Sequence, residues 1–154
     1  MAETLGSLCD KLTVVKLKQW HTRHIQRRQC LSLQESALQR EINEFIVDAL
    51  EGRIPKERLQ FEANKVYRKK GNMVAAVQGE LGEVFSRLAE VNCALWHEQE
   101  KVYAFEKVAD REKCSVVKKL ALLNLERNRC MEAIDKNFLR CVRRKKRTGK
   151  RRCT

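Results

Sequence analysis

Apolar residues recur along the chain at alternating steps of four and three, which is the spacing of an inward-facing seam on an α-helix. Four such seams follow one another in the sequence. They comprise Leu5, Leu8, Leu12 and Val15; Leu31, Leu38, Ile42, Phe45 and Ala49; Leu81, Phe85, Leu88, Asn92, Leu95, Gln99 and Val102; and Val117, Leu120, Asn124, Arg127, Met131, Ile134, Phe138 and Cys141. Four seams predict an all-α fold, namely a four-helix bundle.

Residues that favour caps and turns indicate where these helices begin and end. Thr4 or Ser7 is a candidate N-cap of the first helix, and Gly52 is a natural end of the second. Pro55 suits the first turn of one short additional helix over about residues 56–69. The chain has only six Gly and one Pro, and so few turn signals argue against a many-stranded β protein.

The positive charge of the chain is concentrated at its C-terminus. Thirty-three Lys and Arg against twenty Asp and Glu give a net charge of +13, and residues 140–154 hold nine basic residues and no acidic one. The sequence therefore predicts a helical-bundle domain over residues 1–139 and a disordered basic tail over residues 140–154. The residues predicted to bind nucleic acid are Arg143, Arg144, Lys145, Lys146, Arg147, Lys150, Arg151 and Arg152.

Three other interpretations of this tail stay open. It could simply keep the chain in solution without a dedicated partner, or it could contact an anionic membrane face. In a eukaryotic or viral host, residues 144–147 would also match a nuclear-import signal. No aromatic residue interrupts the basic run, so any binding to nucleic acid is expected to be independent of base sequence.

Cysteine spacing and hydropathy bear on metal binding, membrane insertion and cellular location. The seven Cys contain no C-x-x-C motif and no Cys/His cluster, so we predict neither a metal site nor any other cofactor. Instead, Cys9, Cys93, Cys130 and Cys141 are expected to pack in the core. No apolar run approaches the roughly 18 residues of a membrane span. Without a recognisable secretory signal, we predict a cytoplasmic protein, with a nuclear location open for a eukaryotic host.

Polar residues interrupt the apolar seams at several points. Asp10 and His21 share one side of the first helix, because eleven residues make nearly three helical turns. Asn92 interrupts the third seam, and Asn124 and Arg127 interrupt the fourth. We expect several of these side chains to converge at one level inside the bundle.

A charged group inside a bundle needs a partner, since an unpaired buried charge is very costly. We therefore predict an ion pair between Asp10 and Arg127, and a contact of Asn92 with Asn124 or Asn128. Two interpretations of this layer stay open: it fixes the register of the helices, or it lines a ligand or catalytic pocket. The residues of the predicted polar core or pocket are Asp10, His21, Asn92, Trp96, Asn124, Arg127 and Asn128.

Three short segments, in this order, carry a family resemblance. They are Leu5-Gly6 leading into Asp10-Lys11-Leu12-Thr13, Leu17-Lys18 and Trp20-His21; Val91-Asn92 with Leu95-Trp96 and Glu98; and Leu123-Asn124-Leu125-Glu126-Arg127-Asn128 with Ile134-Asp135. Over about residues 4–139 the chain resembles the small bacterial helical family catalogued as domain of unknown function 4254. The resemblance implies a single all-helical domain with no established activity. It also implies that the polar residues of the seams belong to the family pattern, whereas the basic Cys-containing end does not.

No pattern in the chain indicates a particular reaction, so an enzyme is the less favoured class and no catalytic residue is predicted. We predict an interaction protein that contacts nucleic acid through its basic tail. The alternative is a small-molecule-binding or enzymatic accessory protein that uses the polar pocket. A third hypothesis is homo-oligomerisation through Val14 and Leu17, which form a second apolar stripe on the first helix.

Overall fold

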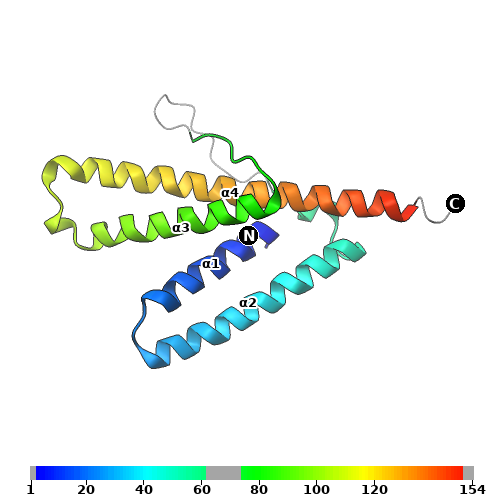
Figure 1. Ribbon diagram of the computed structural model, residues 1–154, viewed down its shortest axis with the longest axis horizontal. Helices are drawn as coiled ribbons and strands as arrows, with labels where there is room; N and C mark the ends of the chain where they lie inside the picture. The colour runs from blue at the N-terminus through cyan, green and yellow to red at the C-terminus, as the bar shows by residue number, and fades with distance from the viewer. Residues whose placement is uncertain (1–2, 62–73, 151–154) are drawn as a thin grey trace.

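The computed structural model describes residues 3–61 and 74–150, the last five of these as backbone only. Over these residues it contains four α-helices and no strand, so the predicted all-α bundle is confirmed. Helices α1 (Leu5–His21) and α2 (Ile25–Glu51) form one antiparallel hairpin, and α3 (Leu81–Tyr103) and α4 (Asp110–Lys150) form the other (Figure 1). None of the described helices combines the length and the apolarity needed to cross a membrane.

The core lies where the two hairpins meet. Helix α1 contacts the other three helices, and α3 packs along α4. Leu88 of α3 and Cys130 and Ile134 of α4 are fully buried there. From α2, Phe45 reaches Phe138 of α4, with 6.2 Å between the ring centroids. The hairpins diverge toward their turns, and the C-terminal end of α4 projects beyond the bundle on the opposite side (Figure 1).

Helix α1 is fixed at its start by a capping box and by a close approach to α4. Thr4 Oγ1 accepts a hydrogen bond from the Ser7 amide at 3.3 Å, and Ser7 Oγ accepts one from the Thr4 amide at 2.9 Å. A Cβ atom at Gly6 would overlap the backbone carbonyl of Met131. Glycine therefore allows the backbones of α1 and α4 to touch at this point. The predicted end of α2 is also confirmed, since Gly52 adopts the left-handed conformation with φ of +82°.

The predicted seam of α4 is partly wrong by one residue. Val116 and Val142 are buried, whereas Val117 and Cys141, which we predicted to face the core, are exposed. Adjacent apolar residues such as Val116 and Val117 leave the phase of a helix ambiguous, and only packing against α1 and α3 decides it. Of the four cysteines predicted to pack in the core, the remaining three agree better, since Cys9 and Cys130 are buried and Cys93 is half-buried.

The basic end of the chain differs from the disordered tail that we predicted. Helix α4 runs through the expected boundary at residues 139–140 without interruption and continues to Lys150. Val142, only 1% exposed, packs in the core beyond that boundary. Arg and Lys are good helix formers, and positive charge is favourable near a helix C-terminus, so the helix persists despite charge repulsion. Residues 151–154, including Arg151 and Arg152, lie outside the described residues.

The short additional helix predicted after Pro55 does not extend past residue 58 within the described residues up to 61. Only a single 3₁₀ turn, η1 (Lys56–Arg58), follows Pro55, and residues 59–61 are not helical. Proline at the start of this turn satisfies the preference that prompted the prediction, but it does not specify how far a helix continues. The rest of the predicted segment lies outside the described residues. A second 3₁₀ turn, η2 (Phe105–Lys107), connects α3 to α4.

Candidate functional site

A buried polar network joins α1, α3 and α4 around the carboxylate of Asp10. The guanidinium of Arg127 donates from Nε to Asp10 Oδ1 at 2.6 Å and from its NH2 group to Asp10 Oδ2. Asn92 Nδ2 donates to Asp10 Oδ1 at 2.9 Å and to Thr13 Oγ1 at 2.6 Å. The Thr13 hydroxyl donates in turn to the carbonyl of Asp10 at 2.8 Å. The predicted ion pair between Asp10 and Arg127 is thus present.

The two partners of this pair differ in exposure. The side chain of Asp10 is 5% exposed and that of Arg127 is 31% exposed, so the arginine provides most of the pair's contact with water. The hydrogen bonds that Arg127 donates to Asp10 raise the pKa of Arg127 above its ordinary value, against the opposing effect of burial. Two parallel N–H···O bonds fix both position and orientation. Because the network spans three helices, it fixes how α1 sits on the α3–α4 hairpin.

A second buried carboxylate, Asp135 of α4, lies at the start of α1. The backbone N–H of Gly6 donates to Asp135 Oδ1 at 2.7 Å. Amides in the first turn of a helix have no partner within the helix, so Asp135 caps α1 from a neighbouring helix. Burial raises the pKa of Asp135 to about 6, although the hydrogen bonds from Gly6 and Thr4 oppose this shift. Burial also raises the pKa of the Cys9 thiol to about 12, which keeps this cysteine protonated and unreactive.

His21 and Trp96 do not belong to the Asp10 network, contrary to the prediction. His21 is exposed, and its ring stacks on Trp96 with 4.7 Å between the centroids and 18° between the planes. Eleven residues return a helix to the same side, but they also advance it by about 16 Å along its axis. Asp10 and His21 therefore share a face of α1 at different levels.

Asn124 and Asn128 also fall outside the network. Asn124 is exposed, and its Nδ2 donates to the carbonyl of Leu120 in its own helix at 3.1 Å. Asn128 is half-buried, and Asn92 contacts Asp10 and Thr13 instead of either predicted asparagine. The expected interior level therefore contains Asp10, Asn92 and Arg127. Thr13, which completes it, was missed because a half-buried threonine has no distinctive sequence pattern.

Glu98 of α3 is a buried acid that the sequence pattern did not reveal. Its Oε1 accepts hydrogen bonds from Lys119 Nζ at 2.5 Å and from Lys101 Nζ at 2.9 Å. These bonds, the one from Lys119 first, lower the pKa of Glu98 below its ordinary value. We had predicted the neighbouring Gln99 to face inward, but Gln99 is exposed. The sequence alone could not show this site, because Lys101 and Lys119 meet at Glu98 only through the packing of α3 on α4.

A pocket of about 410 Å³ lies beside the Asp10–Arg127 pair, between α1, α2 and α4. Asp10 and Arg127 form part of its wall but direct their polar atoms at each other. Neither Asn92 nor His21 lines the pocket. Val14, one of the two residues proposed for self-association, lies in its wall, and Leu17 is half-buried. The pocket therefore combines the predicted charged pair with a set of side chains that differs from the predicted one.

The basic end of α4 presents positive charge beyond the bundle. Arg140, Arg143, Arg144 and Lys145 are exposed on the C-terminal part of the helix, whose last turns project past the end of α2 (Figure 1). Residues 140–150 hold seven Lys or Arg and no Asp or Glu. Lys146, Arg147 and Lys150 continue the same helix. The structure thus gathers the described part of the predicted nucleic-acid residues onto a single helical element.

Comparison of the chain with protein-family models, with curated proteins and with solved structures gave no match. The resemblance to the family of domain of unknown function 4254 stays a prediction.

Proposed function

We propose that this protein binds nucleic acid without sequence preference through the basic C-terminal end of α4. The observation that carries the proposal is the continuation of α4 to Lys150, which supports seven basic residues and no acidic one on a helix that projects from the bundle. Eleven helical residues extend over about 16 Å, a length along which duplex nucleic acid carries several phosphates.

The chemistry of this end favours phosphates over bases. Lys and Arg bind phosphate oxygens and release condensed counterions, which supplies affinity that does not depend on base sequence. The helix loses less conformational freedom on binding than a disordered tail would, because its backbone is already ordered. Residues 140–154 contain no aromatic side chain, so base stacking is not expected here.

A charge-neutralised variant of the full chain tests this proposal. We expect R140Q/R143Q/R144Q to bind a labelled random-sequence duplex more weakly than the natural chain in a fluorescence anisotropy titration. Each lost phosphate contact should reduce the slope of log affinity against log salt by about one. The matched control, K107Q/R111Q/K118Q, removes the same charge from η2 and the first turns of α4, where these side chains are also exposed. Equal affinities for the two variants would contradict the proposal.

The pocket beside Asp10 and Arg127 supports a second candidate function, the binding of a small anionic molecule. Three basic residues, Lys11, Lys18 and Arg127, outnumber the acidic residues Asp10 and Glu41 in its lining, and its volume of about 410 Å³ is within the range of ligand pockets. Phosphate or citrate should then raise the melting temperature of the chain, and A37F, which fills the pocket, should abolish that rise. If both proteins respond equally to these anions, the pocket is not the binding site.

A further inference from the structure

The first hairpin carries a second basic surface, separate from the basic end of α4. Between Lys11 and Gln34 the sequence has six Lys or Arg and no Asp or Glu. The turn between α1 and α2 brings Arg23, Arg27 and Arg28 to the end of this hairpin, and all three are exposed. Such a local excess of one charge attracts an anionic partner, and here it lies far along the molecule from the basic end of α4 (Figure 1).

This basic stretch also carries an aromatic side chain that does not pack in the core. Trp20, in the last turn of α1, is 86% exposed. The neighbouring His21 stacks on Trp96 of α3, so the contact between the hairpins at this level is made by His21. An exposed indole in a basic stretch of the chain differs from the basic end of α4, which has no aromatic residue. It offers a flat apolar face on which a base can stack.

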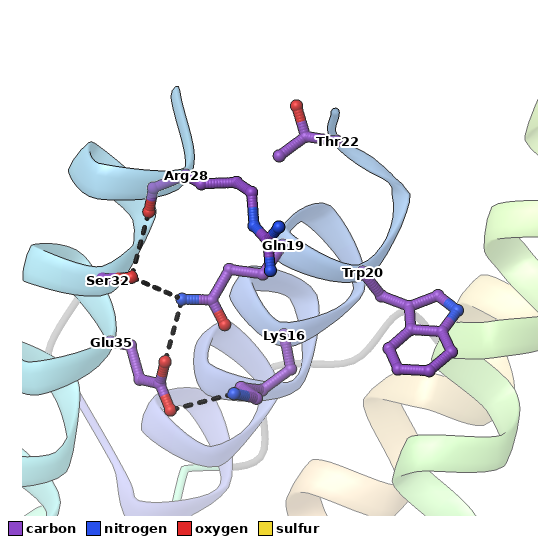
Figure 2. A pocket seen from close by; sticks show the side chains of 7 residues that line it. All are labelled: Lys16, Gln19, Trp20, Thr22, Arg28, Ser32 and Glu35. Atoms are coloured by element: carbon purple, nitrogen blue, oxygen red, sulfur yellow. Dashed lines mark hydrogen bonds and ion pairs between the residues drawn. The ribbon is translucent and has the colours of Figure 1, made fainter. Parts of the chain in front are cut away.

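Next to Trp20 lies a pocket of about 500 Å³ between the end of α1 and the start of α2 (Figure 2). Gln19 Nε2 donates to Glu35 Oε2 at 2.8 Å and lies 3.5 Å from Ser32 Oγ, and Lys16 Nζ lies 3.0 Å from Glu35 Oε1. The side chain of Arg28 reaches from α2 across the pocket toward Gln19 (Figure 2). The pocket therefore presents amide, hydroxyl and carboxylate groups beside a cation, and the indole of Trp20 points away from these groups on the other side of α1 (Figure 2).

We propose that the α1–α2 turn binds unpaired nucleotides of a single-stranded nucleic acid. A base stacks on Trp20, and the flanking phosphates contact Arg23, Arg27 and Arg28. This proposal rests on the nucleic-acid function proposed above and assigns to it the class of substrate. The end of α4 then supplies affinity common to all nucleic acids, and the turn supplies a preference for single strands.

An anionic membrane is the competing partner for this surface, since Ile25 and Leu33 of α2 are both 74% exposed. The observations favour the nucleic acid. Insertion of the turn into lipid would take Gln19, Ser32 and Glu35 out of water, and the burial of such polar groups without new hydrogen bonds is costly. A strand with unpaired bases instead offers donors and acceptors of its own.

The test compares binding of the full chain to an oligodeoxythymidine of about 20 nucleotides and to a duplex of equal length, by anisotropy. We expect W20A to weaken binding to the single strand about tenfold and to leave binding to the duplex unchanged. W20F should retain most of the affinity, because it keeps an aromatic face. Y103A is the matched control, since Tyr103 is another exposed aromatic residue, 81% exposed, on the other hairpin; it should bind both ligands as the natural chain does.

Several results would overturn the proposal. They are a W20A variant with unchanged affinity for the single strand, an equal loss for the duplex, or Trp20-dependent binding to vesicles of anionic phospholipid in place of oligonucleotide. The function proposed for the end of α4 fails separately, when R140Q/R143Q/R144Q keeps its affinity for the duplex. Circular dichroism of each variant confirms that the helices are retained.

Discussion

Two regions use charged residues in opposite ways: the core where the two hairpins meet, called the crossing below, and the turn between α1 and α2. At the crossing, Asp10 is buried and each of its oxygens accepts a hydrogen bond from Arg127. At the turn, Arg23, Arg27 and Arg28 are exposed in a stretch of sequence that has no acidic residue. A buried charge must be paired, whereas an exposed one keeps its water and stays available to a partner. Stability should therefore depend on the crossing, and binding on the exposed basic surfaces.

The largest effect is expected from breaking the buried ion pair. Arg127→Met leaves the Asp10 carboxylate buried without its main partner, and should lower the free energy of unfolding by about 3–5 kcal/mol. The double variant D10L/R127M should recover much of this loss, because an apolar pair needs no desolvated charge. Urea denaturation followed by circular dichroism measures both. Simple additivity of D10L and R127M would show that the two side chains are not coupled.

An effect of intermediate size is expected at the backbone contact of Gly6. Gly6→Ala places a methyl group against the carbonyl of Met131, so α1 must move away from α4. We expect a loss of about 1–3 kcal/mol in the free energy of unfolding. Gly82→Ala is the control, because a Cβ there has no atom within 4 Å, and alanine should stabilise this exposed helical position by up to about 1 kcal/mol. A stabilising Gly6→Ala would mean that the helices do not approach so closely.

The buried carboxylate of Asp135 should make stability depend on pH. Its pKa is about 6 in the folded chain, above the ordinary value of 3.8, so the folded state binds this proton more tightly than the unfolded state. The stabilisation from the bound proton is present at low pH and is lost as the pH rises through the interval between these two values. Asp135→Asn removes the titration and keeps an acceptor for the Gly6 amide.

The stability of D135N relative to the natural chain should therefore be greatest near about pH 7, and should decrease by about 2–3 kcal/mol on acidification to about pH 4. Unfolding free energies from urea titrations across this interval provide the measurement. A difference between the two proteins that does not change with pH would show that Asp135 titrates as an ordinary exposed carboxyl.

The smallest effect is expected at the turn. Trp20→Ala should change the free energy of unfolding by less than about 0.5 kcal/mol, because the indole is 86% exposed. Thermal denaturation measures this directly. A loss of several kcal/mol would place Trp20 in the fold and remove the contrast between the two regions.

Sequence reasoning placed correctly those buried residues whose charge requires a partner of opposite charge, because few residues can provide one. Arg127 interrupts the apolar seam of the fourth helix, Asp10 lies on one side of the first, and each needs the charge of the other. His21 was misplaced because its spacing from Asp10 shows that both lie on the same side of α1 but does not show how far apart they are along the helix axis. Asn124 was misplaced because adjacent apolar residues left the phase of α4 undetermined.

Other features leave no trace in a pattern of side chains. The partner of Asp135 is the backbone amide of Gly6, which every residue except proline carries. The helical state of residues 140–150 was missed because the rule for charge runs predicts disorder, whereas Val142 anchors this part of α4 to the core. Both outcomes depend on tertiary packing.

The central claim is that the exposed basic surfaces bind phosphates while the buried charges hold the fold. The most direct measurement is the affinity of the natural full chain for single-stranded nucleic acid as a function of salt, from about 50 to about 200 mM. We predict a linear fall of log affinity with log salt, with a slope of about −3 or steeper, as several phosphate contacts require. An affinity that does not change over this interval, or no binding at its lower end, would contradict the claim.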